Sequence, residues 1–209
     1  MGKIDIPKAV AELDEELVIA GVKEQIAAGI PAVEILSELQ QGMEQVGKLY
    51  ESGEYYLSEL IMSADVFATA SAQLSEVLKS DGDTKSLGTI VLGTVKDDIH
   101  DIGKNIVATI LNCNGFRVVD LGVDVPIDTF VAAVKEHNPQ VVGMCCLLTT
   151  SFDIMKDTVA AVKDTASSAK VLVGGGPVDT NVAKYCNADD YCKSAYEAVE
   201  YTRKYCGVQ

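Results

Sequence analysis

The first third of the chain carries apolar residues at helical spacing. Between Ile6 and Leu78 they recur every three or four positions, which is the period of helices that bury one face. Gly29 can end one helix, Pro31 suits the first turn of the next, and the polar stretch 51–54 separates two more. The pattern predicts a small bundle of about four helices.

The pattern changes after residues 79–86, a polar and glycine-bearing stretch without periodicity that is typical of a connection between domains. We therefore expect a helical domain at 1–82 and a second domain at 83–209. In the second domain, short β-rich runs alternate with amphipathic helices about five times. The clearest runs are 87–95, 116–122, 140–146 and 170–176. This alternation predicts an α/β fold with a doubly wound, flavodoxin-like or Rossmann-like sheet of five parallel strands.

Ligands in such sheets bind beyond the carboxyl ends of the strands. The rule directs attention to the loops that follow Val95, Leu121, Cys146 and Gly174. Candidate chemistry is therefore sought in these four loops.

Composition and charge narrow the possible functions. Hydrophobic residues make up 48% of the chain, yet no apolar run approaches the roughly 20 residues of a membrane span, and the first residues lack an apolar signal core. With 17 basic and 31 acidic residues, the formal net charge of -14 repels nucleic acid and anionic lipids. The six cysteines form no C-x-x-C pair, so we expect reduced thiols and a cytoplasmic protein without nucleic-acid or membrane partners.

The loop after the first strand contains the clearest candidate chemistry. Asp98 precedes His100 by two residues, and a carboxylate at that spacing can hold one ring nitrogen so that the other serves as a metal ligand or base. Gly103 would allow a bulky group to approach the backbone. The alternative is that Asp98 and Asp101 are exposed loop charges and His100 a surface residue, and the spacing alone leaves both interpretations open.

Three motifs in order resemble the cobalamin-binding domain family. They are the D-x-H-x-x-G motif of 98–103, the second-loop residues 145–147 with 149–151, and the third-loop run 173–178. The helical domain ahead of them resembles the cap of methionine synthase and of the corrinoid proteins of methanogen and acetogen methyltransferase systems. The resemblance extends from about residue 10 to 205.

The resemblance implies a role for individual residues. His100 would be the lower cobalt ligand in place of the cofactor's dimethylbenzimidazole, Asp98 would bond its distal nitrogen, and Ser151 would bond Asp98 to complete a proton relay. Gly103 would leave room for the displaced nucleotide tail, Cys192 would lie near the buried base just after the last strand, and 120–126 would flank the corrin edge. The remaining implied cofactor contacts are Asp101, Cys145, Leu147, Thr149, Gly174 and Gly175, and the cap residues Tyr50, Leu57 and Leu60 over the upper face.

Two positions depart from the family pattern. Asp97 stands where the family usually has glycine, which adds a charged side chain to a tight turn. Cys145 replaces a usual serine with a weaker hydrogen-bond partner of similar shape. We expect these changes to affect the affinity for the tail more than the ligation of cobalt.

By this resemblance the chain is a methyl carrier that binds cobalamin or a related corrinoid. It would take a methyl group on cobalt from a substrate:corrinoid methyltransferase and deliver it to an acceptor methyltransferase that uses tetrahydrofolate or a thiol coenzyme. A reductive activase would restore oxidised cobalt. The connection at 79–86 would act as a hinge that uncovers the cofactor. The chain would be one component of a multi-protein system rather than a complete enzyme.

Three other classes are weighed against the methyl carrier. A cobalamin-binding regulator shares the cap and sheet but typically carries a DNA-reading module and a basic surface. The small subunit of a cobalamin-dependent mutase shares the histidine motif but lacks the helical cap. A flavin-binding or receiver-type module would leave Asp98, His100 and Ser151 without a joint role.

Overall fold

The computed structural model describes residues 4–74, 86–166 and 168–208. The chain separates into two compact units, one within 1–85 and the other within 86–209. The boundary expected between 82 and 83, and the hinge expected at 79–86 except for Ser86, lie outside the described residues. Each unit is therefore described by itself.

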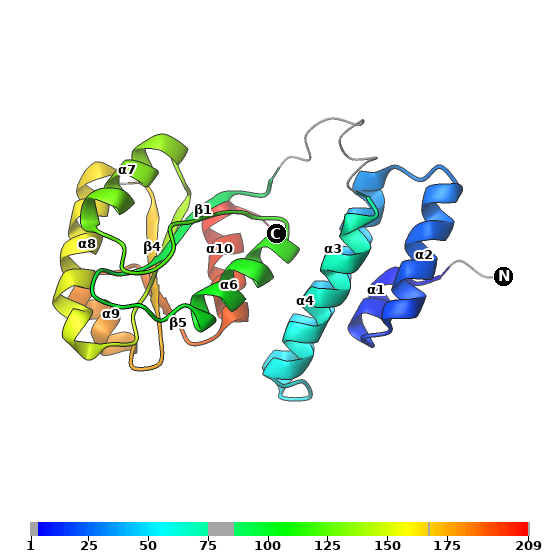
Figure 1. Ribbon diagram of the computed structural model, residues 1–209, viewed down its shortest axis with the longest axis horizontal. Helices are drawn as coiled ribbons and strands as arrows, with labels where there is room; N and C mark the ends of the chain where they lie inside the picture. Colours follow the sequence, from blue (N-terminus) through cyan, green and yellow to red (C-terminus); the bar gives the residue numbers. More distant parts are fainter. Residues whose placement is uncertain (1–3, 75–85, 167, 209) are drawn as a thin grey trace. The chain divides into compact units, whose positions relative to one another are not determined.

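The first unit is a bundle of helices, in agreement with the apolar periodicity (Figure 1). In its described part these are α1 (Ile6–Ala11), α2 (Glu15–Ala27), α3 (Ala32–Ser52) and α4 (Leu57–Ala72). Asp5 and Asp14 cap the first two helices by accepting backbone N–H bonds, and Gly53 ends α3 in the left-handed conformation. Pro31 lies at the N-cap of α3, one position before the predicted first turn.

The second unit contains a sheet of five parallel strands, as predicted. The strands are β1 (Thr89–Thr94), β2 (Arg117–Asp120), β3 (Val141–Cys145), β4 (Lys170–Gly174) and β5 (Asp190–Cys192). They are ordered β2-β1-β3-β4-β5, which is the flavodoxin-like arrangement. Cys192 is the last residue of β5, not a residue beyond it as expected from the sequence.

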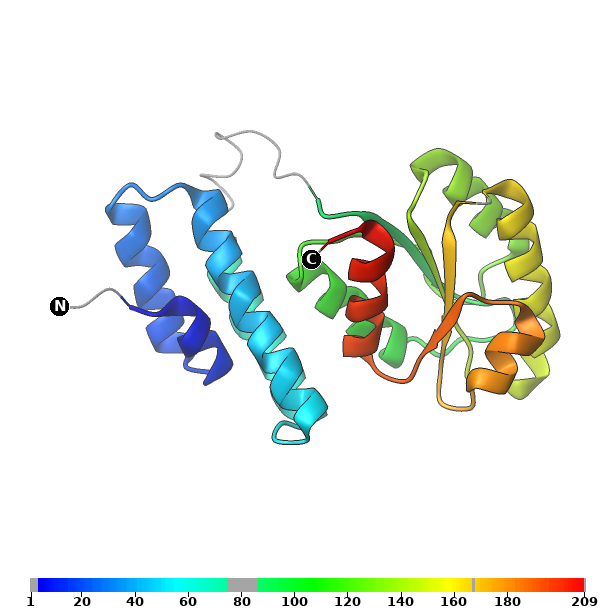
Figure 2. The same ribbon diagram turned by 180° about the vertical axis from the view of Figure 1, so that it is seen from behind.

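Helices cover both faces of the sheet (Figures 1 and 2). They are α6 (Ile102–Cys113), α7 (Ile127–His137), α8 (Phe152–Thr165), α9 (Thr180–Cys186) and α10 (Ala195–Cys206). Helices α6 and α10 pack together on one face, and α7, α8 and α9 lie side by side on the other. Because both faces are covered, the central strands are buried almost throughout, which explains why they read as continuous apolar runs.

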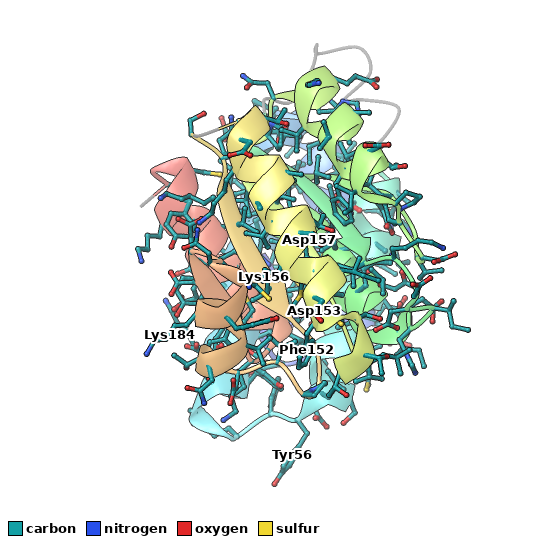
Figure 3. The ribbon with its side chains drawn as sticks, turned by 90° about the vertical axis from the view of Figure 1, so that its left-hand side faces the viewer. Tyr56, Phe152, Asp153, Lys156, Asp157 and Lys184 are labelled. Atoms are coloured by element: carbon teal, nitrogen blue, oxygen red, sulfur yellow. The ribbon has the colours of Figure 1, made fainter. Side chains whose placement is uncertain are left out.

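The outer surface of α8 and α9 is polar (Figure 3). Asp153, Lys156 and Asp157 project from the outer side of α8, and Lys184 projects from α9. The ammonium of Lys156 lies 4.3 Å from the ring centroid of Tyr185. All six cysteines have free thiols, and no helix in the described part of the chain has the length and apolar character needed to cross a membrane.

The strand order creates a switch point between β1 and β3. The chain crosses from β1 to β2 on one side and from β2 back past β1 to β3 on the other. The connections diverge there, so the loops after β1 and β3 lie at the place on the carboxyl edge where such sheets bind ligands. These are the loops that contain 95–101 and 146–151.

The carboxylate of Asp189 ties β5 to β4. It accepts hydrogen bonds from the backbone N–H of Val171, at 2.9 Å, and from the ammonium of Lys170, at 2.9 Å, and lies 3.2 Å from the ammonium of Lys163. Burial alone would raise the pKa of Asp189, but these partners outweigh it and lower the pKa below the ordinary value. The resulting stabilisation is present above the ordinary carboxyl pKa and is lost as the pH falls through the lowered one.

We therefore predict that Asp189→Asn lowers the free energy of unfolding by about 1 kcal/mol at neutral pH. The difference from the wild type should shrink below about pH 4, because the wild-type carboxyl takes up a proton first in the unfolded protein and then in the folded protein. Urea unfolding between pH 3 and pH 7 measures this, with the exposed Asp157→Asn as a control that should change little. A difference that stayed constant with pH would contradict the assignment.

Candidate functional site

Asp98 and His100 form a hydrogen-bonded pair in the loop after β1. Nδ1 of His100 lies 2.7 Å from Oδ1 of Asp98, and the same oxygen accepts the backbone N–H of His100 at 3.0 Å. The other carboxylate oxygen, Oδ2, accepts the N–H groups of Leu147 and Leu148 at 2.6 and 3.0 Å. Asp98 thus joins the β1 and β3 loops across the switch point.

The surroundings of Asp98 keep its carboxylate ionised. Its side chain is 0% exposed, and burial alone would raise its pKa, but the N–H groups of His100, Leu147 and Leu148 outweigh burial and lower the pKa to about 2. An ionised carboxylate offers only acceptors, so Nδ1 of His100 must carry the proton of their shared bond. In the neutral imidazole the lone pair is then on Nε2, as a metal ligand requires.

The backbone of His100 is also held by a side-chain hydrogen bond. Oγ1 of Thr94, the buried last residue of β1, donates to the carbonyl of His100 at 2.8 Å. The imidazole itself remains 49% exposed. Sequence reasoning missed Thr94, although a hydroxyl at the end of an otherwise apolar strand was the signal. The result is a fixed imidazole whose free nitrogen can meet a ligand.

Ser151 does not make the hydrogen bond that the resemblance implied. Its side chain is buried, but its Oγ atom has no hydrogen-bond partner among the residues that the structure describes, and the predicted contact with Asp98 is absent. The reason is that four N–H groups already occupy the acceptor positions of the Asp98 carboxylate. The backbone of Leu147 and Leu148 takes the place predicted for Ser151.

Three predicted tail contacts lie in one row across the sheet. Cys145, Gly174 and Cys192 are register partners on β3, β4 and β5, and Thr94 continues the row on β1. Register partners point to the same face, here the face of α6 and α10. Burial raises the pKa of both thiols to about 12, so the sulfurs stay neutral. A Cβ at Gly174 would lie 3.3 Å from the carbonyl oxygen of Cys192, so glycine suits this close approach of the two strands.

The glycines of the site differ in what a side chain would meet. A Cβ at Gly175, where φ is +133°, would lie 1.9 Å from the carbonyl oxygen of Cys146, so this glycine is required by the fold itself. A Cβ at Gly103 would meet nothing within 4 Å. Packing within the chain therefore does not explain Gly103, whereas the predicted space for a ligand does.

The two loops that Asp98 joins carry exposed apolar side chains. Ile99 and Ile102 flank His100 in sequence and are 73% and 76% exposed, and Leu147 and Leu148 are also exposed. Exposed apolar groups in loops that also carry a held polar side chain are typical of a ligand site.

The two remaining predicted contacts in these loops occupy helix starts. Asp101 is the N-cap residue of α6, where its carboxylate accepts the side-chain amide of Asn105, and Thr149 begins the short 3-10 helix Thr149–Ser151. Asp101 belongs to the loop after β1 and Thr149 to the loop after β3, and their contact with a cofactor stays a prediction.

The three predicted cap residues belong to the helical unit and differ in exposure. Tyr50 near the end of α3 is partly buried, Leu57 at the start of α4 is 45% exposed, and Leu60 is 1% exposed. The exposed apolar neighbours on α4 are Ile61 and Met62. That Tyr50, Leu57 and Leu60 cover a corrin stays a prediction, and the burial of Leu60 makes it the least suited of the three.

The residues of the sheet unit fit a corrinoid. Nε2 of His100 would hold the metal, the exposed isoleucines suit the edge of a large apolar ring, and the row of small side chains suits an inserted tail. Among the residues that the structure describes, the buried Oγ of Ser151 has no hydrogen-bond partner. Fold and site together fit the class of proteins that bind a large metal-containing ring.

Comparison with known proteins identifies this class. Residues 88–200 match a family model described as a B12 binding domain, and residues 5–75 match a second model with the same description. The chain therefore belongs to the B12-binding, or cobalamin-binding, family. The resemblance drawn from the three motifs and the helical cap is confirmed, and with it the expected fold and cofactor class.

The similarity to known relatives extends over nearly the full length of this chain. The chain is 40% identical over 199 residues to trimethylamine corrinoid protein 1 of Methanosarcina acetivorans, covering 93% of this chain and 92% of the relative, and 38% identical over 197 residues to dimethylamine corrinoid protein 2 of the same organism, covering 93% and 91%. A cobalamin-binding protein from Desulfitobacterium hafniense shares 36% identity at a TM-score of 0.82, covering 98% of both chains. A chain of the methanol:cobalamin methyltransferase complex from Methanosarcina barkeri shares 30% identity at 0.84, covering 98% of this chain and 79% of the other.

Proposed function

We propose that this protein is a corrinoid methyl carrier that works between two methyltransferases. The single observation that carries the proposal is the held imidazole: Asp98 fixes Nδ1 of His100 at 2.7 Å at the switch point of the sheet and leaves Nε2 free. The full-length similarity to methylamine corrinoid proteins supports the same function.

The residues of the site bind and orient the cofactor. When bound, cobalamin supplies a cobalt centre that can accept a methyl group and give it up again. His100 would hold the cobalt through Nε2, and Asp98 would keep the proton on Nδ1 so that Nε2 stays available. The row of Cys145, Gly174 and Cys192 receives the tail.

A methyl carrier takes the methyl group from one protein and gives it to another, so it works with partner methyltransferases. The donor-side partner is a methyltransferase for a methylated amine, since the relatives of 38–40% identity are trimethylamine and dimethylamine corrinoid proteins. The acceptor side is a second methyltransferase, and a reductive activase returns oxidised cobalt to the cycle. A cytoplasmic location suits this chemistry and the six free thiols.

Reconstitution tests the proposal directly. The protein is incubated with hydroxocobalamin, passed through gel filtration and examined by visible spectroscopy, and we expect a red protein that retains about one cobalt per chain. The reduced holoprotein is then mixed with purified trimethylamine, dimethylamine or methanol methyltransferase and the matching donor. Cobalt-bound methyl that forms with an amine system supports the proposal. If cobalt-bound methyl forms only with the methanol system, the proposed donor is wrong and methanol replaces it. If the cofactor is lost during gel filtration, the proposed function is overturned.

A further inference from the structure

The turn that carries His100 contains a residue in an unfavourable backbone conformation. Asp97 has φ of +65°, in the left-handed region that glycine adopts freely and other residues avoid. His100 follows Asp97 by three residues, so the direction of this turn sets where the imidazole points. Something in the fold must hold Asp97 there.

Asp124, in the loop after β2, bonds to three consecutive residues of that turn. Its Oδ1 accepts the backbone N–H of Asp97 at 2.8 Å and the ammonium of Lys96 at 2.6 Å. Its own N–H donates to the carbonyl of Asp98 at 2.8 Å. A parallel bridge between Val95 and Val125 places the two segments side by side just before these bonds.

We propose that Asp124 is a positioning residue for His100, because its carboxylate holds the turn at Asp97 in the left-handed conformation. The inference rests on the proposed function, since it concerns the imidazole as a cobalt ligand. A ligand must be held within about 0.5 Å of its productive place. Without the acceptor on Asp124, the N–H of Asp97 loses its bond to the loop after β2, and the turn that leads to the Asp98–His100 pair is held less firmly.

The ion pair between Asp124 and Lys96 is not the interaction that holds the turn. The Lys96 and Asp124 side chains are 41% and 43% exposed, and pairs in such positions contribute little. The bond to the Asp97 N–H acts on the backbone. Lys96→Ala should therefore leave ligation unchanged, and Asp124→Asn, which keeps an acceptor oxygen, should remain close to the wild type.

The test measures cobalt ligation and cobalamin affinity in reconstituted protein. We expect Asp124→Ala to bind cobalamin about tenfold more weakly and to shift the visible spectrum toward the form without a histidine ligand. Adding Asp97→Gly to Asp124→Ala should restore most of both, since glycine adopts the turn without support. Asp14→Ala, which removes a similar carboxylate-to-amide bond at the start of α2, is the matched control and should match the wild type.

The outcomes separate this inference from the proposed function. If His100→Ala shifts the spectrum while Asp124→Ala matches the wild type, the positioning role is overturned and the ligand assignment stands. If Asp124→Ala loses affinity but Asp97→Gly does not restore it, the turn is not what Asp124 holds, and the inference also fails. If His100→Ala itself leaves the spectrum unchanged, it is the proposed ligation that fails.

Discussion

Replacing His100 with alanine is expected to shift the visible spectrum of the cobalamin-loaded protein and to weaken cobalamin binding at least about tenfold. Its Nε2 is the nitrogen that we propose as the cobalt ligand, with Nδ1 held 2.7 Å from the Asp98 carboxylate. Methyl transfer should fall by at least the same factor. Titration of the apoprotein with hydroxocobalamin, followed by absorbance and by filtration of unbound cofactor, measures both effects.

His137 is the natural control, because it is the only other histidine in the sequence. It lies in the last turn of α7, a helix of the opposite face from α6 and α10. His137→Ala should leave the spectrum and the affinity as they are in the wild type. A His100→Ala protein with an unaltered spectrum would show that another group ligates cobalt.

Asp98→Ala should cause the largest loss of folding stability among the variants of this site. It leaves the backbone N–H groups of His100, Leu147 and Leu148 without their acceptor. Each lost bond at a buried donor costs about 1 kcal/mol or more, so we expect the free energy of unfolding to fall by about 3 kcal/mol. Urea unfolding of the apoprotein, which contains no cobalamin, isolates this effect from ligand binding.

Two further variants sharpen that measurement. Asp98→Asn keeps one acceptor oxygen but turns an amide NH2 toward other donors, so it should be destabilised almost as much. Asp101→Ala, three residues further along the same loop, loses a single exposed contact with Asn105 and should change stability by less than about 0.5 kcal/mol. Equal stabilities for Asp98→Ala and Asp101→Ala would mean that the buried carboxylate does not hold the two loops together.

Most of the fold could be predicted because it depends on local patterns. The change from helical periodicity to alternating apolar runs and amphipathic helices identified the helical unit and the parallel sheet. The Asp98–His100 pair was also predicted, since two residues in one loop can bond without help from distant segments. The end of β5 was misplaced because a three-residue edge strand has too few positions to show a pattern.

The contacts that the sequence missed or misassigned are made between segments far apart in the chain. Ser151 was expected to bond Asp98, but the backbone amides of Leu147 and Leu148 take that place, and backbone donors leave no trace in residue identity. The bond between Asp97 and Asp124 was missed for a similar reason, since only the crossover from β1 to β2 brings the two loops together.

The sequence by itself determined the two units, the order of strands and helices along the chain, and the residue types able to ligate a metal, because these follow from periodicity and side-chain chemistry. Only the tertiary structure decided the spatial order of the strands and the register row of Cys145, Gly174 and Cys192. It also decided which donors surround the carboxylate of Asp98. Hydrogen bonds act over about 3 Å, so their partners are fixed only when packing brings distant backbone segments to that separation.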